Sequence, residues 1–167
     1  KPKTIYKNIN FIYTTINGIY KIFHGSNLTL NNFNNKHTKI RELLNIDNVD
    51  SGFYNYKHNY LGILYKNNIH KYNLHRHQIE AIVNIKDFFK NIDTTISIKC
   101  LFYLANKIYI FSDKNIIIYD LSNEKIIKET DTINIFEKIP EKIDCRFLNY
   151  NDVEEYSPIP YIYVLKN

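Results

Sequence analysis

The fold is decided by residues 98–120, which read IKCLFYLANKIYIFSDKNIIIYD. The apolar and β-branched runs in this stretch are short, and turn residues interrupt them at positions 105–107 and 112–115. This pattern predicts three antiparallel strands rather than helices. Because a three-stranded sheet has one apolar face that it cannot bury by itself, we expect further copies of the unit elsewhere in the chain.

Four segments open with the same pattern, which is Ile or Val, a polar residue, two variable residues and an aromatic residue. They begin at Ile9, Val49, Ile98 and Ile143, so the unit recurs about every 40 to 50 residues, as propeller blades do. We predict a second strand at residues 19–23, 61–65, 108–111 and 162–165. We predict a third strand at residues 28–31, 71–73 and 118–120, and the fourth copy ends before one.

A helical pattern follows each of the first three copies. Apolar residues recur at spacings of three and four within residues 36–45, 78–90 and 132–138, so we predict a short helix in each. The chain is then a single domain over residues 1–167. Its blades are expected at about residues 9–46, 49–90, 93–138 and 139–167.

Residues 136–147, FEKIPEKIDCRF, resemble the junction between blades of hemopexin-like repeats. In that family an apolar–Pro turn leads into an Ile/Val-Asp-Ala-Ala-Phe first strand. Residues 108–111 and 119–120 are similar to the family's second and third strands. The resemblance implies a mostly β fold, a small four-bladed β-propeller of hemopexin-like type with short helices between blades and an incomplete last blade. The sequence departs from the family where Cys100-Leu101 and Cys145-Arg146 replace two small residues.

The resemblance also implies an ion in a central channel. The corresponding positions are Asn10, Asp50, Lys99 and Asp144, and the expected ion is calcium, sodium or chloride held by oxygen atoms or the channel backbone. Lys99 departs from the acidic pattern, which argues against a cation. The alternative is that these polar residues end the strands at the rim. No other cofactor is expected.

Three histidines, His70, His75 and His77, lie close together in the second copy. On an extended strand His75 and His77 would point to the same side, as metal ligands do. They are the candidate ligand-binding residues, and the only candidates for haem under the hemopexin-like interpretation. No Cys or carboxylate joins them at zinc-like spacing, so the alternative is an exposed loop that leads into the predicted helix.

Cys100 and Cys145 occupy the same position in neighbouring copies. A disulfide needs Cα atoms within about 7 Å, and the sequence leaves open whether the two pair or remain buried thiols. No His stands at a repeat position that would activate either sulfur. The chain also lacks a Gly-rich phosphate loop, a Gly-x-Ser-x-Gly elbow and a His-Glu-x-x-His motif. The sequence therefore predicts a protein without enzymatic activity.

The composition excludes several kinds of partner. The net charge is +5, but Lys and Arg are spread along the chain among acidic residues, which argues against nucleic-acid binding. No run approaches the ~18 apolar residues of a membrane helix. The glycosylation sequon Asn27-Leu28-Thr29 favours secretion, although an Asn-rich chain contains such a match by chance. The compartment is otherwise left open.

These observations favour a non-catalytic binding module of hemopexin-like type. Its loops and rim would recognise a protein partner, with a glycan or haem as alternative ligands, and oligomerisation is left open. The competing hypothesis is a structural subunit of a larger assembly, in which a partner completes the open fourth blade. Fold resemblance alone supports such functions only weakly, because function depends on the site.

Overall fold

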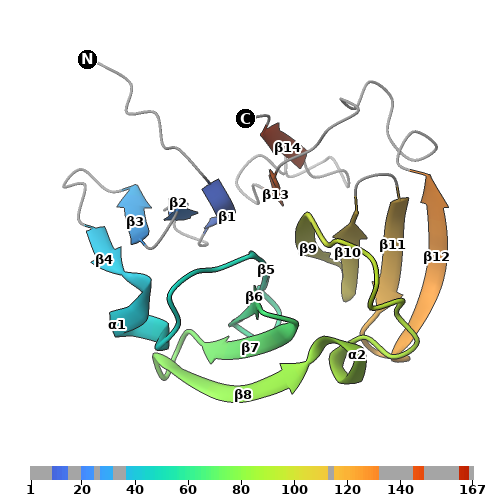
Figure 1. The fold of residues 1–167 in the computed structure, drawn as a ribbon, viewed down its shortest axis with the longest axis horizontal. Coiled ribbons are helices and arrows are strands. Elements are labelled where there is room, and N and C mark those ends of the chain that lie inside the picture. The colour runs from blue at the N-terminus through green and yellow to red at the C-terminus, as the bar shows by residue number, and fades with distance from the viewer. Residues whose placement is uncertain are drawn as a thin grey trace.

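The structure of the chain, a computed structural model, describes residues 9–14, 20–24, 27–31, 37–112, 115–131, 145–148 and 162–165. Almost all described elements are strands, and they form antiparallel sheets in which consecutive strands pair (Figure 1). The described helices are short. The prediction of a mostly β fold is therefore confirmed.

The described strands make four sheets, each in simple up-and-down order. The first contains β1 (Ile9–Thr14), β2 (Tyr20–His24), β3 (Asn27–Asn31) and β4 (His37–Lys39). The second contains β5 (Ser51–Asn55), β6 (Tyr60–Tyr65), β7 (Asn68–Asn73) and β8 (Gln78–Asn84). The third contains β9 (Cys100–Leu104), β10 (Lys107–Phe111), β11 (Asn115–Asp120) and β12 (Lys125–Asp131). Within the described residues the fourth contains β13 (Cys145–Leu148) and β14 (Ile162–Leu165).

Tight turns set the hairpins of the second and third sheets. Lys66 and Asn67 have φ of 45° and 62°, and Ala105 and Asn106 have φ of 49° and 64°. Positive φ at both central residues is the geometry of a two-residue turn whose twist matches that of the flanking strands. Asn tolerates this conformation, which is why a chain with few glycines can build these turns.

The helices predicted between the copies are largely wrong. Residues 78–84 form β8, and only Ile85–Phe88 are helical, as α2. Along β8 every second residue from Ile79 to Val83 is half-buried while Gln78, Glu80 and Ile82 are exposed, which is the period of a strand. Likewise β4 takes the first part of the first predicted helix, and α1 is confined to Ile40–Leu44. The third predicted helix, residues 132–138, lies outside the described residues.

The hairpins of the second, third and fourth sheets share one register. In each, the Phe of the first strand faces the second residue of the predicted second strand, and the pairs are Phe53–Gly62, Phe102–Tyr109 and Phe147–Tyr163. In the first sheet the aromatic residue at the same place of the repeat is Tyr13, which faces Lys21, so that register differs by one residue. The second and third sheets also share a β-bulge, between Lys71 and Tyr72 and between Ile118 and Tyr119. The repeat seen in the sequence is therefore a repeat of backbone pairing.

The first strands of the sheets contact one another in the order β1, β5, β9, β13 and back to β1. In Figure 1 these strands lie toward the middle of the molecule, whereas β4, β8 and β12 lie at its periphery. The sheets therefore present their faces to one another. Within the described part of the chain, no helix has the length and apolar character needed to span a bilayer.

The apolar core fills the spaces between neighbouring sheets. Phe11 packs with Tyr54 and Tyr72 of the second sheet, in a cluster that α1 helps to cover with Ile40 and Leu44. Phe53 belongs to a second cluster with residues of the third sheet, namely Leu101, Tyr103, Ile108, Ile110, Ile117 and Tyr119. Phe11 and Phe53 thus pack toward the following sheet, whereas Phe102 packs with residues of its own sheet. The first two contacts agree with the expectation that one unit cannot bury its apolar face alone.

Candidate functional site

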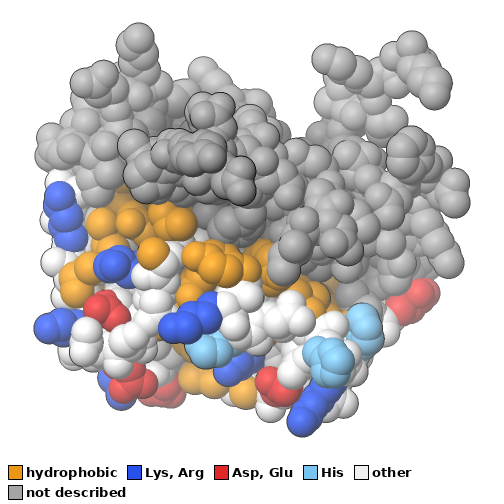
Figure 2. All heavy atoms as spheres, turned by 180° about the vertical axis from the view of Figure 1, so that it is seen from behind, with side chains coloured by type: hydrophobic (Ala, Val, Ile, Leu, Met, Phe, Trp, Pro, Cys, Tyr) orange, Lys and Arg blue, Asp and Glu red, His pale blue; other side chains and the backbone are white. Residues whose placement is uncertain are grey.

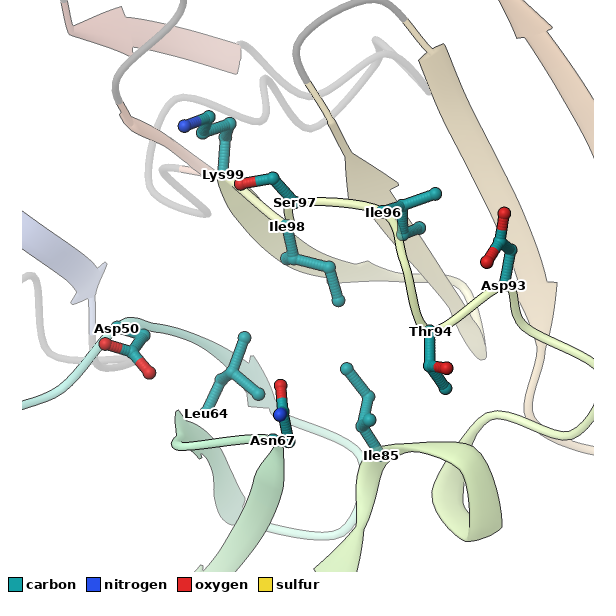
Figure 3. A pocket seen from close by; sticks show the side chains of 10 residues that line it. All are labelled: Asp50, Leu64, Asn67, Ile85, Asp93, Thr94, Ile96, Ser97, Ile98 and Lys99. Carbon is teal, nitrogen blue, oxygen red and sulfur yellow. The ribbon is translucent and has the colours of Figure 1, made fainter.

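A hollow lies between the second and third sheets, at the end where β5 and β9 begin (Figure 3). Its volume is about 440 Å³, within the range of about 300–1,000 Å³ typical of small-ligand sites. The polar residues that line it are Asp50, Asn67, Asp93, Thr94, Ser97 and Lys99. The apolar ones are Leu64, Ile85, Ile96 and Ile98. We call this cavity the first hollow.

The first hollow exists because the connection into the third sheet is long. Residues 45–50 join α1 to β5, whereas residues 89–99 join α2 to β9. The additional residues form a turn held by Asp93, whose carboxylate accepts hydrogen bonds from the Thr95 amide (2.9 Å) and hydroxyl (2.7 Å). The Ile96 amide also donates to the Asp93 carbonyl (3.3 Å). This turn forms one wall of the first hollow.

Asp50 and Lys99 stand at equivalent places on the two sides of the first hollow. The Asp50 amide donates to the Leu64 carbonyl (2.8 Å), and the Lys99 amide donates to the Phe111 carbonyl (2.7 Å), so each residue extends the ladder beside its first strand. The Asp50 carboxylate also accepts a hydrogen bond from the Lys66 amide (3.0 Å). The same backbone position therefore presents opposite charges in neighbouring sheets.

These two residues are half of the predicted channel set. Asn10 lies on β1 and Asp144 lies outside the described residues. No group of three or more His, Cys, Asp or Glu within the described residues could hold a metal ion. The channel ion stays a prediction, and the structure places Asp50 and Lys99 around a hollow between sheets.

Electrostatically, the first hollow has two carboxylates and one ammonium group. The hydrogen bonds from Thr95 lower the pKa of Asp93 below its usual value, so this carboxylate is ionised at neutral pH. Thr94 and Ser97 add hydroxyl groups, and Asn67 adds an amide. The carboxylates, hydroxyl groups and amide of the first hollow can therefore bind hydrogen-bond donors of a ligand, and its Leu and Ile side chains can contact aliphatic groups.

The predicted histidine cluster is divided between two environments. His70 lies on β7 and is 6 % exposed, and burial lowers the pKa of its imidazole. His75 and His77 are exposed in the turn between β7 and β8, where the His75 amide donates to the Asn73 side chain (2.8 Å). His75 and His77 thus lie in an exposed loop, as the alternative interpretation expected, but that loop leads into β8 and not directly into a helix. A ligand-binding role for the three histidines stays a prediction.

Cys100 begins β9 and is 1 % exposed. Cys145 begins β13, which contacts β9. The two residues thus hold equivalent positions in the backbone pairing, opposite Phe111 and Leu165. Whether they pair stays open, since nothing is described of the Cys145 side chain.

Sequence reasoning missed Asp93, Thr94 and Ser97. An Asp followed by two Thr residues is a signal for a side-chain-capped turn, but it does not reveal that the turn borders a cavity. The apolar wall was also missed, because Ile85 comes from α2 and Leu64 from β6. These residues meet only when two sheets pack together.

The similarity of this chain to known proteins is found in its structure and not in its sequence. No protein-family model matches the chain, and no curated protein matches it. A plant albumin from Cicer arietinum showing hemagglutination is similar in structure, with a TM-score of 0.72, 17 % identity, and coverage of 96 % of this chain and 84 % of that one. A plant lectin with two metal binding sites, also from Cicer arietinum, has a TM-score of 0.69, 16 % identity and the same coverages, 96 % and 84 %.

A hemopexin fold protein, CP4 from cow pea, is also similar in structure. Its TM-score is 0.61 at 16 % identity, with 75 % of this chain and 68 % of that chain covered. The structural neighbours of this chain thus include plant albumins, a lectin and a hemopexin-fold protein. At such low identity the similarity concerns the fold alone.

Proposed function

We propose that the protein is a non-catalytic binding module, a four-bladed propeller of hemopexin-like type, that recognises a protein partner around the first hollow. The cyclic order of contacts between first strands and the similarity to a hemopexin-fold protein support the propeller. The observation on which the binding role depends is the first hollow itself, where unlike charges, hydroxyl groups and apolar walls come together.

The charge of the first hollow suggests what it binds. The whole chain has a net charge of +5, and basic and acidic side chains are interspersed on the face that Figure 2 shows. In the first hollow, by contrast, Asp50 and Asp93 outnumber the one cation, Lys99. A basic side chain of a partner would pair its charge with these carboxylates, and its methylene stem would lie against Ile96 and Ile98. A lysine or arginine on a partner loop therefore fits the chemistry of the first hollow.

Selection from a displayed library of random peptides tests this function. Peptides enriched on the protein should contain a Lys or Arg, and Asp50→Asn should weaken their binding about tenfold, because it removes one partner of a charge-assisted hydrogen bond. Asn retains an oxygen that can accept from the Lys66 amide, so the turn should persist.

The matched control is Asp47→Asn. This exposed carboxylate pairs with Arg41 at 3.6 Å outside the first hollow, and such a surface pair contributes little. Equal loss of binding in both variants, or enrichment of peptides without basic residues, would contradict the proposal.

A glycan is the second candidate ligand, favoured because two structural neighbours are named as a lectin and as an albumin showing hemagglutination. The hydroxyl and carboxylate groups of the first hollow are suited to sugar hydroxyls. Agglutination of red cells by a dimerised form of the protein, and its inhibition by free sugars, would favour this candidate. Agglutination that no free sugar inhibits would favour a protein ligand.

A further inference from the structure

A second hollow of about 480 Å³ lies between the same two sheets, at the opposite ends of their strands. The β5–β6 turn contributes Lys57, β7 contributes Lys71, α2 contributes Asp87 and Phe88, and the β11–β12 turn contributes Ser122. None of these residues belongs to the first hollow. The second hollow therefore requires an explanation of its own.

The charge of the second hollow is opposite in sign to that of the first. Glu124 lies at its edge, but the ammonium group of Lys90 pairs with that carboxylate. Lys57 and Lys71 have no ion-pair partner within the described residues, which leaves two cations against the single carboxylate of Asp87. An anionic ligand would complete this balance.

The position of Lys71 is defined by an aromatic ring. Its ammonium group lies 4.5 Å from the centre of the Tyr60 ring, a cation–π contact. Tyr60 is buried, and Asn55 hydrogen-bonds its hydroxyl. Burial raises the pKa of Tyr60, so the ring next to Lys71 remains uncharged at neutral pH. The Tyr60 ring thereby holds the Lys71 ammonium group in place. Because the ring is uncharged, the ammonium group can still pair with an anionic ligand.

The other groups of the second hollow are suited to hydroxyl groups and to an apolar ring face. Asp87 is an acceptor, and Ser122 is hydrogen-bonded to the Asn106 side chain, which orients its hydroxyl. Phe88 is half-buried, and Val83 lies beside it in the lining. The C–H face of a sugar ring packs well against such side chains. A simple anion would use the lysines alone and leave these groups without a role.

We propose that the second hollow binds a sugar acid, meaning a single sugar ring that carries one carboxylate. The carboxylate pairs with Lys57 and Lys71, the ring hydroxyls donate to Asp87 and bond with Ser122, and one ring face lies against Phe88. Binding is then specific because neither the charge nor the hydroxyl groups suffice alone. This site is independent of the protein partner proposed for the first hollow.

Titration of the isotope-labelled full chain with glucuronate, followed by NMR, tests this site. We expect shifts at the amides of residues 57–60, 71 and 121–124. Glucose lacks the carboxylate and acetate lacks the hydroxyl groups, so each should bind at least about tenfold more weakly. Equal binding of glucose would overturn the role of the lysines, and equal binding of acetate would overturn the sugar.

Variants separate this site from unspecific attraction to a basic protein. Lys71→Met keeps the length of the side chain and should weaken glucuronate binding about tenfold, whereas the exposed Lys128→Met on β12 should leave it unchanged. If Lys71→Met fails to fold, Lys57→Met in the exposed turn gives the same test. Unchanged binding in both hollow variants, or equal loss in Lys128→Met, would overturn the proposal. Asp50→Asn should leave glucuronate binding intact, so failure of the first hollow can be told apart from failure here.

Discussion

The second and third sheets have the same backbone but are packed differently. In both, a bulge follows the fourth residue pair between the third and fourth strands. Both also close with a side-chain-capped turn. Asn73 accepts hydrogen bonds from the amides of His75 (2.8 Å) and Arg76 (2.9 Å), and Asp120 accepts from those of Ser122 (2.8 Å) and Asn123 (3.2 Å). The difference between the sheets lies in their side chains, which must fit different neighbours.

Three equivalent positions show this difference. Gly62 of β6 corresponds to Tyr109 of β10, His70 of β7 to Ile117 of β11, and Asp50 to Lys99 before the first strands. In the third sheet the Phe102 ring stacks on Tyr109, with centres 4.6 Å apart and planes 7° apart. The second sheet has no side chain at that place. The repeat therefore preserves the backbone hydrogen bonds within each sheet. The side chains differ because each sheet packs against a different neighbour.

The largest expected effect comes from making the two sheets more alike at Gly62. A methyl group on Gly62 would lie 2.2 Å from Cε1 and Cζ of Phe53. Because the Phe53 ring is fully buried and cannot move aside, we expect Gly62→Ala to lower the free energy of unfolding by about 3 kcal/mol. The midpoint of urea unfolding measures this change.

Combining Gly62→Ala with Phe53→Leu provides the control. Leu leaves room at the place where the ring lay. The double variant should therefore lose less stability than the sum of the two single losses. If the two effects simply add, the Phe53 ring is not the group that excludes a side chain at Gly62.

An intermediate effect is expected where the second sheet has a buried histidine. Nδ1 of His70 has no hydrogen-bond partner within the described residues. The centres of the His70 and Tyr65 rings are 6.1 Å apart, which is an aromatic contact and not a hydrogen bond. Replacing His70 by the isoleucine of the third sheet removes an unsatisfied buried group. We expect His70→Ile to stabilise the protein by about 1 kcal/mol at pH 7.

The pH dependence sharpens this test. Burial lowers the pKa of His70 below its ordinary value of 6.5, so the folded state favours neutral imidazole. The associated stability is fully present above pH 6.5 and is lost as the pH falls below that value. The stability advantage of His70→Ile over the parent should therefore be largest at mildly acidic pH.

The reciprocal change Ile117→His places a histidine in the third sheet instead. Ile117 is 3 % exposed, so we expect a loss of about 2 kcal/mol and a new acid sensitivity. Unfolding midpoints between pH 5 and 8 would decide both variants. A flat difference between His70→Ile and the parent across this range would mean that His70 does not titrate on unfolding.

The smallest effect is expected at the capped turns. Hydrogen bonds from Asn123 and from Ser122 lower the pKa of the exposed Asp120 carboxyl below 3.8. Its contribution to stability is present above that value and is lost as the pH falls further. Asp120→Asn should keep the turn, because Asn73 caps the equivalent turn of the second sheet. It should also make the free energy of unfolding less dependent on pH below pH 4. Asn73→Asp should introduce that slope, and thermal unfolding between pH 2.5 and 5 would compare the two.

The strands were predictable because their signals are local. Residues 108–111 were expected to form a strand and lie within β10, and residues 162–165 coincide with β14. Residues 78–84 were not predictable in this way, since Ile79, Ile82 and Val83 satisfy helical spacing as well as strand alternation. The pairing of β8 with β7 decided between the two.

The candidate site was predictable only in part. Asp50 and Lys99 were recognised because they immediately precede first strands of the repeat. Asp93, Ser97 and Lys71 were not, because their roles depend on the length of the connection at 89–99 and on which sheet faces which. Such relations join residues that are distant in sequence, and no local pattern records them.

The amino-acid sequence alone determined that a short strand unit recurs, because periods of apolar residues and Asn-rich turns are set by neighbouring residues. Tertiary structure alone decided the hollows, the burial of His70 and the close approach of the Phe53 ring to Gly62. Those features depend on how one sheet face meets the next, and the packing of side chains across that space is not encoded in either sheet separately.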